Sequence, residues 1–127
     1  MVRDEAYYNS ITEVIIGCAF KVGNALGTGF LEKVYENALS YEIGESELTV
    51  QQQHPIKVFY ENVIVGEYFV DLLVQDEVVV ELKAIKALDS SHFAQCMNYL
   101  KATGKKVCLL INFGAPKLEI KRIVNTL

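Results

Sequence analysis

The chain has 127 residues, a length typical of one domain, and we expect residues 1–127 to form a single unit. Hydrophobic residues make up 51% and charged residues 22% of the sequence, a composition that excludes an intrinsically disordered chain. No run approaches ~18 consecutive apolar residues, and the N-terminal residues lack the pattern of a signal peptide. We therefore expect a cytoplasmic protein with no membrane partner.

The cysteines and the charge distribution narrow the class of protein further. Cys18, Cys96 and Cys108 are widely spaced in apolar surroundings and form no CxxC pair, which predicts buried free thiols. The formal net charge of −4 argues against a nucleic-acid binder, yet residues 101–127 hold six basic side chains and one acidic side chain. This basic end could supply contacts to phosphate, although a solvated surface is the simpler interpretation.

The first half of the chain predicts two helices followed by strands. Apolar residues recur at three- and four-residue spacing over residues 6–26 and again over 30–44, and the Gly-Thr-Gly between them favours a helix–helix corner. From Leu48 the period changes to two, which predicts strands over residues 50–60 and 63–74 with a turn at Glu61 and Asn62.

The second half predicts a strand, a helix and two further strands. Residues 78–85 are almost entirely apolar and so favour a central strand. Asp89 or Ser90 can cap a helix that runs to about residue 102, and Gly104 fits its C-terminal cap. Strands follow over residues 106–112, in a parallel βαβ unit, and over 118–124 at an edge. The fold class is α/β, more strictly an α+β mixed sheet flanked by helices.

The chemically informative residues lie on the hairpin formed by the second and third predicted strands. Asp71 is the one charge in the run 69–74, and Glu81 and Lys83 are the charges in the run 78–83. Burying a carboxylate in such a run costs several kcal/mol unless something compensates it.

Symmetric pairing about Asp76 places Asp71 opposite Glu81, and it places Lys83 on the same face of the sheet. Two opposed carboxylates repel unless a cation lies between them, and oxygen ligands suit Mg²⁺ or Mn²⁺. A lysine beside them could activate water and offset charge on a phosphate, as metal-assisted phosphodiester hydrolysis requires. The alternative is an ion pair of Lys83 with Asp71 or Glu81 on a solvated face, and a one-residue slip would separate the two acids.

Helical residues could join this site. Gln95 and Tyr99 are four residues apart and share a helix face, from which Gln95 could reach Lys83 or a metal-bound water. The other interpretation makes Gln95 a surface residue and Tyr99 a core residue. Glu32 could be a third acid at the site, or it could simply stabilise the start of its helix.

Several longer motifs resemble one family. The sequence is similar to GxxExxY proteins of the PD-(D/E)XK nuclease superfamily over about residues 8–125. The matching segments are the Gly-x-x-Glu-x-x-Tyr motif at residues 29–35, the Glu-x-Lys strand at 79–84, the Gln-x-x-x-Tyr helix at 94–104 and the strand at 110–114. One departure is Val70, which stands where the superfamily motif has proline.

The resemblance implies a restriction-endonuclease-like αβββαβ core with flanking helices. It implies that Asp71 and Glu81 are metal ligands, that Lys83 is catalytic, that Glu32 approaches the same site and that Gln95 supports it. We accordingly expect a Mg²⁺- or Mn²⁺-dependent nuclease acting on nucleic acid, with DNA preferred as the substrate. The alternative is a nuclease-fold accessory module that binds nucleic acid or protein without turnover. The small size favours a homodimer or a protein partner in either case.

Overall fold

The computed structural model describes residues 3–126, which form three helices and five strands. In chain order these are α1 (Glu5–Leu26), α2 (Glu32–Glu45), β1 (Val50–Tyr60), β2 (Val63–Val74), β3 (Val78–Lys83), α3 (Ser90–Thr103), β4 (Val107–Asn112) and β5 (Glu119–Val124). The order agrees with the one expected from the sequence. Within the described residues, no helix combines the length and the apolar character needed to cross a membrane.

Two boundaries differ from the prediction by two residues, for identifiable reasons, and the others differ by one residue at most. β3 ends at Lys83 rather than at Ile85, because the backbone N–H and C=O of Ile85 bond to the side chain of Asn112 instead of to a strand. α2 begins at Glu32 rather than at residue 30, because Gly29 has a φ of 109° and Leu31 is still extended. Both departures come from residues outside the periodic pattern.

The five strands form one mixed sheet in the order β1-β2-β3-β4-β5. β3 and β4 are parallel and are joined through α3, while the other neighbouring pairs are antiparallel. β3 is therefore the central strand and β5 an edge strand, as the sequence predicts.

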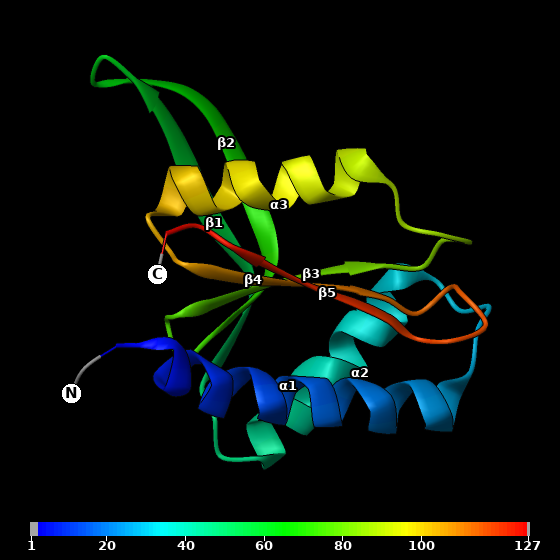
Figure 1. The fold of residues 1–127 in the computed structure, drawn as a ribbon. Helices are drawn as coiled ribbons and strands as arrows, with labels where there is room; N and C mark the ends of the chain where they lie inside the picture. The colour runs from blue at the N-terminus through cyan, green and yellow to red at the C-terminus, as the bar shows by residue number, and fades with distance from the viewer. Residues whose placement is uncertain (1–2, 127) are drawn as a thin grey trace.

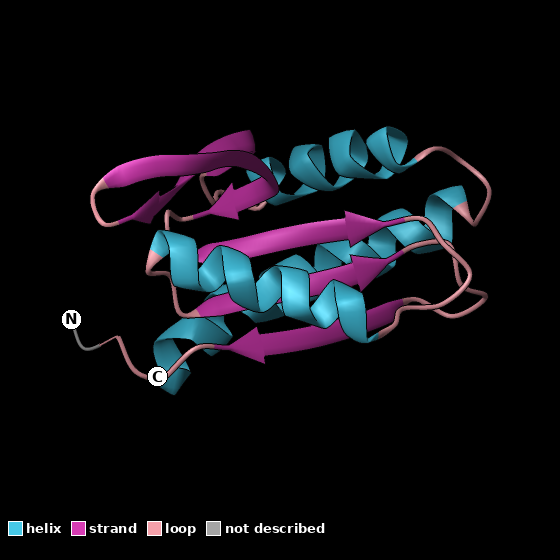
Figure 2. Ribbon diagram, turned by 90° about the horizontal axis from the view of Figure 1, so that it is seen from above, coloured by secondary structure: helices cyan, strands magenta, loops and turns pink. Residues whose placement is uncertain are grey.

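Helices cover both faces of the sheet. α1 and α2 lie against one face and α3 against the other (Figures 1 and 2). Alternate strand residues serve the two cores: Leu72 and Leu82 pack toward α1 and α2, whereas Leu73 and Val79 pack toward α3. All three cysteines are buried and free, as expected.

The corner between α1 and α2 fixes the start of α2. The Tyr35 hydroxyl donates a hydrogen bond to the backbone oxygen of Gly27 and accepts one from the N–H of Phe30 at 3.3 Å. The Tyr35 ring is fully buried and stacks on Phe113, with ring centroids 4.8 Å apart. The glycine-containing motif is thus a folded corner that places Glu32 in the first turn of α2.

The β1–β2 hairpin extends well beyond the rest of the sheet. Glu61 and Asn62 at its turn have φ values of 48° and 67°, the left-handed conformation of a tight hairpin turn. The hairpin runs up past α3, and its end stands clear of the body (Figure 1). Large apolar side chains on this part of the hairpin are exposed, which an isolated domain has no structural reason to require.

Candidate active site

The β2–β3 hairpin brings the two predicted acids together. Its register pairs Leu72 with Val80, Leu73 with Val79 and Val74 with Val78, which confirms the predicted symmetry about Asp76. The next pair outward in this register is Asp71 and Glu81. The two acids therefore face each other at the point where the β2–β3 ladder ends.

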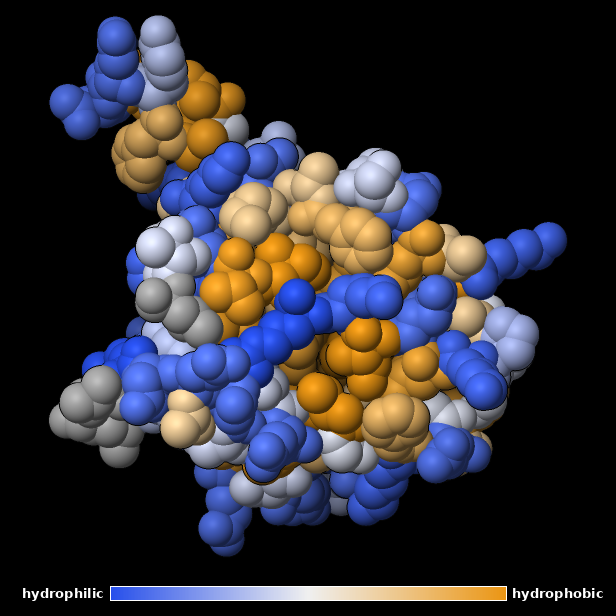
Figure 3. Space-filling model, in the orientation of Figure 1, coloured by the Kyte–Doolittle hydropathy of each residue, from blue (hydrophilic) through white to orange (hydrophobic). Residues whose placement is uncertain are grey.

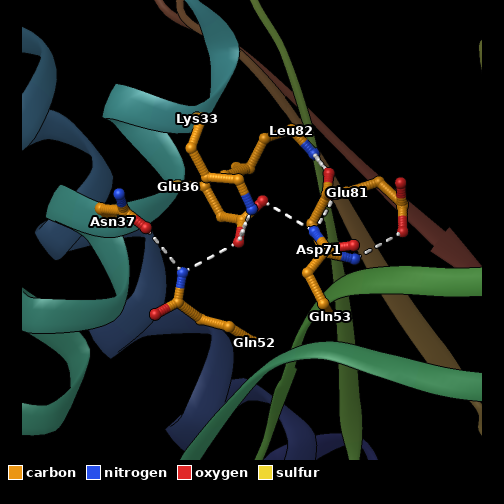
Figure 4. A network of polar contacts seen from close by, with 8 residues as sticks. All are labelled: Lys33, Glu36, Asn37, Gln52, Gln53, Asp71, Glu81 and Leu82. Atoms are coloured by element: carbon orange, nitrogen blue, oxygen red, sulfur yellow. Dashed lines mark hydrogen bonds and ion pairs between the residues drawn. The ribbon is translucent and has the colours of Figure 1, made fainter.

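Side-chain bonds replace the backbone ladder at this point. The N–H of Asp71 donates to Oε1 of Glu81 at 3.1 Å, and the N–H of Leu82 donates to Oδ2 of Asp71 at 2.8 Å. Each carboxylate is thus tied to the opposite strand (Figure 4). This exchange holds both acids at one end of the central strands.

Burial opposes ionisation of both acids. Glu81 is only 4% exposed, and burial together with the charge of Asp71 raises its pKa to about 9. Burial also raises the pKa of Asp71, although the hydrogen bonds from Leu82 and Gln53 pull it back down. A bound cation would stabilise the ionised forms of both acids.

The charge of Lys83 lowers the pKa of both acids, but burial outweighs it and both pKa values stay raised. No ion pair in residues 3–126 joins Lys83 to an acid, and Glu81 is buried rather than solvated. The alternative of a surface ion pair is therefore wrong. The Lys83 ammonium instead donates to Oε1 of Gln95 at 3.3 Å, and Nε2 of Gln95 donates to the Tyr99 hydroxyl at 3.0 Å.

Tyr99 lies behind Gln95 in this chain of contacts. It is 8% exposed, and burial followed by the charges of Glu81 and Asp71 raises its pKa to about 12. The phenol stays neutral at ordinary pH and keeps Gln95 in one orientation. Gln95 thus links Lys83 to the buried Tyr99 by hydrogen bonds and is not a free surface residue.

Two acids of α2 face the same end of the sheet. Burial and the charge of Asp71 raise the pKa of Glu32, and the charge of Lys83 lowers it, so Glu32 lies within electrostatic reach of both. Glu36, one turn later, is 2% exposed and was not identified from the sequence. Its position was nevertheless informative, because Glu36 falls in the apolar stripe that Leu39 and Ile43 continue.

Gln53 joins α2 to the hairpin acids. Its Nε2 donates to Oε1 of Glu36 at 2.8 Å and to Oδ1 of Asp71 at 3.2 Å, while Gln52 donates to Oε2 of Glu36 at 2.8 Å (Figure 4). Gln53 has a φ of 52°, so β1 is locally distorted where this bridge forms. Neither glutamine could be identified from the sequence, because the bridge depends on how α2 packs against β1.

The loop after Lys83 is held from the neighbouring strand. The N–H of Phe113 donates to the backbone oxygen of Lys83 at 2.8 Å, and the buried Asn112 amide bonds both backbone groups of Ile85. Gly114 approaches so closely that a Cβ there would lie 2.3 Å from the backbone nitrogen of Ile85. These contacts fix the backbone that carries Lys83.

The donor set fits a hard divalent cation. Carboxylate oxygens are the ligands that Mg²⁺ and Mn²⁺ prefer, and the buried carboxylate of Glu81 forms no ion pair within residues 3–126. As the side chains stand, no three acids, histidines or cysteines in residues 3–126 converge into one cluster. Asp71 and Glu81 are the two acids that could hold such a cation.

The comparison with known families agrees with this geometry. Residues 9–123 match the PD-(D/E)XK nuclease superfamily, and the chain belongs to that superfamily. Its enzymes generally depend on a divalent metal. No curated protein matches the chain in sequence.

Solved structures share the fold at low sequence identity. An alkaline exonuclease from Laribacter hongkongensis superposes with a TM-score of 0.55 at 15% identity, covering 99% of this chain and 73% of the other. The protein SSO0001 superposes with a TM-score of 0.57 at 14% identity, covering 96% of this chain and 62% of the other. The likeness supports the assignment of a restriction-endonuclease-like fold.

Proposed function

We propose that this protein is a divalent-metal-dependent nuclease that hydrolyses phosphodiester bonds of DNA, and that it belongs to the GxxExxY group within the superfamily. One observation carries the proposal: the buried Glu81 lies opposite the half-buried Asp71, and Lys83 lies near both acids without forming an ion pair with either of them. A purely structural hairpin would gain stability from replacing both acids with apolar residues.

The roles follow from the contacts of each side chain. Asp71 and Glu81 would hold Mg²⁺ or Mn²⁺, which when bound supplies Lewis acidity toward a phosphate oxygen. Lys83 forms no ion pair with an acid among residues 3–126 and is oriented by Gln95, so its ammonium can stabilise the charge that develops on the phosphate and hold the attacking water. Glu32 lies within reach of both charges and can accept a proton from that water.

The second candidate is an accessory module that binds without turnover. It is favoured by the bonds from backbone N–H groups to both carboxylates, which partly satisfy the acids without a metal. Either candidate can act as a homodimer or with a protein partner, because the chain carries only 127 residues.

Metal titration calorimetry together with digestion of DNA and RNA in Mg²⁺ and in Mn²⁺ separates the candidates. We expect Asp71→Asn to lose metal binding and Lys83→Ala to keep it while cleaving DNA at least ~100-fold more slowly. Lys86→Ala is the matched control, because Lys86 is an exposed lysine three residues further along the chain. Metal binding by the wild type without cleavage of any substrate would favour the accessory module, and absence of metal binding would refute the nuclease.

A further inference from the structure

A groove adjoins the candidate active site between the β1–β2 hairpin and α3. It has a volume of about 850 Å³, within the range of ligand sites, and is open along its length. The projecting hairpin that forms one wall carries hydrophobic side chains (Figure 3). The second wall is one face of α3.

The helical wall is polar and carries a positive charge. Ser91, Gln95, Asn98 and Lys101 recur at three- and four-residue spacing along α3 and all line the groove. Every lining residue within the described part of the chain is apolar, neutral polar or basic, although the protein as a whole has a net charge of −4. Among residues 3–126, the groove thus carries one lysine and no acid, so it does not repel an anionic chain.

The hairpin wall presents aromatic rings. Tyr68 is 50% exposed and Phe59 is 60% exposed, and both line the groove. The Tyr68 ring leans against the ring of Tyr99, with centroids 5.9 Å apart, so it is held in place while part of its surface stays open. Exposed rings beside a cationic side chain are the combination that binds single-stranded nucleic acid by base stacking.

The groove is continuous with the site. Gln95 lines the groove through one part of its side chain and accepts the hydrogen bond of Lys83 through another. The backbone of a nucleic-acid strand in the groove therefore extends toward Asp71, Glu81 and Lys83. A duplex offers no free base faces to the rings, because its bases are stacked on one another.

We propose that the groove between the β1–β2 hairpin and α3 binds an unpaired nucleic-acid strand, whose bases stack on Tyr68 and Phe59 and whose phosphates contact Lys101. The inference rests on the proposed function only for the position of the scissile phosphate. According to the proposal, residues other than Asp71, Glu81 and Lys83 select an unpaired substrate.

Fluorescence anisotropy in EDTA tests the proposal without cleavage. Three labelled probes of about 12 nucleotides are compared: a single strand, the blunt duplex of the same sequence, and an abasic strand that keeps the phosphates. We expect the single strand to bind most tightly and Tyr68→Ala to weaken that binding about tenfold, a loss typical of one stacked base. Tyr68→Phe should retain the affinity.

Phe69→Ala is the matched control. Phe69 is the next residue of β2, is 57% exposed and points to the opposite face of the hairpin, away from the groove. We expect less than about a twofold change in Kd for this variant, in line with an exposed ring that no base contacts. Photo-crosslinking of a halogenated strand to wild-type protein should label Tyr68 or Phe59, a readout that needs no folded variant.

Equal loss of affinity in Phe69→Ala and Tyr68→Ala would overturn the proposal, as would equal binding of the abasic and intact strands. Sedimentation that shows a dimer broken by Tyr68→Ala would overturn it too, because a second copy would then occupy the groove. Stacking-dependent binding without cleavage in Mg²⁺ would refute the nuclease function and leave the groove assignment standing. Cleavage of duplex DNA at the same rate in wild type and Tyr68→Ala would refute the groove assignment and leave the nuclease function standing.

Discussion

Replacing Glu81 with glutamine should change how the stability of the metal-free protein depends on pH. The pKa of Glu81 rises from 4.5 to about 9 on folding, because the side chain is 4% exposed and faces Asp71. Between these two values the folded protein holds a proton that the unfolded chain releases. The free energy of unfolding therefore falls as pH rises through this window.

The slope follows from the single proton. One proton corresponds to about 1.4 kcal/mol per pH unit, or about 4 kcal/mol between about pH 5.5 and pH 8.5. Burial also raises the pKa of Asp71 and of Glu32, which adds slope of the same sign just above the ordinary pKa of each group. Glu81→Gln should remove the contribution of Glu81 to the slope of the unfolding free energy against pH, because a neutral amide has no proton to release in this range.

Urea unfolding followed by circular dichroism in EDTA, over that pH range, measures the slope directly. Glu13→Gln is the matched control, since Glu13 is exposed on α1 and should leave the slope unchanged. If Glu81→Gln keeps the slope of the wild type, Glu81 is already ionised in the folded protein. The argument that the acid pair needs a cation would then fail.

Three further substitutions, one of them compared with Gly17→Ala in α1, test the supports of the site. Tyr35→Phe should lower the free energy of unfolding by about 1–2 kcal/mol in urea, because the Gly27 oxygen loses its buried donor; an unchanged midpoint would show that the hydroxyl is dispensable. Gly114→Ala should cost more than about 2 kcal/mol, since its Cβ would lie 2.3 Å from a backbone nitrogen, whereas Gly17→Ala, with no atom within 4 Å, should stabilise α1 by about 0.5–1 kcal/mol. Thermal melts that rank these two variants the other way round would contradict the geometry. Gln95→Ala should slow cleavage about tenfold or more while calorimetry shows unchanged metal affinity, and a fall in metal affinity would make Gln95 part of the metal site instead.

The acidic hairpin could be predicted because its information is local. The short break at residues 75–77 determines the register, since the length of a hairpin turn decides which residues of its two strands face each other. The register then places Asp71 opposite Glu81 without reference to the rest of the fold. Gln95 was predictable for a related reason, because a βαβ unit returns its helix beside the strand that precedes it.

The contribution of α2 could be predicted only in part. Glu32 was singled out through the family motif, whereas Glu36 was missed although it interrupts the apolar stripe of its helix. Gln53 could not be found, since its contacts to Glu36 and Asp71 span 17 and 18 residues and depend on a local distortion of β1. The exposed rings of the β1–β2 hairpin also escaped prediction, because alternation identifies a strand but does not reveal how far it extends past its neighbours.

The exchanged bonds at the end of the β2–β3 ladder give the site a spectroscopic signature. The amide protons of Asp71 and Leu82 are each hydrogen-bonded to a carboxylate oxygen of the acid pair, and a cation bound by these carboxylates would weaken both hydrogen bonds. Their nuclear magnetic resonance frequencies should therefore shift together on addition of Mg²⁺, and they should do so in a Lys83→Ala protein that does not cleave. Two backbone resonances can thus report occupancy of the site before any substrate is known.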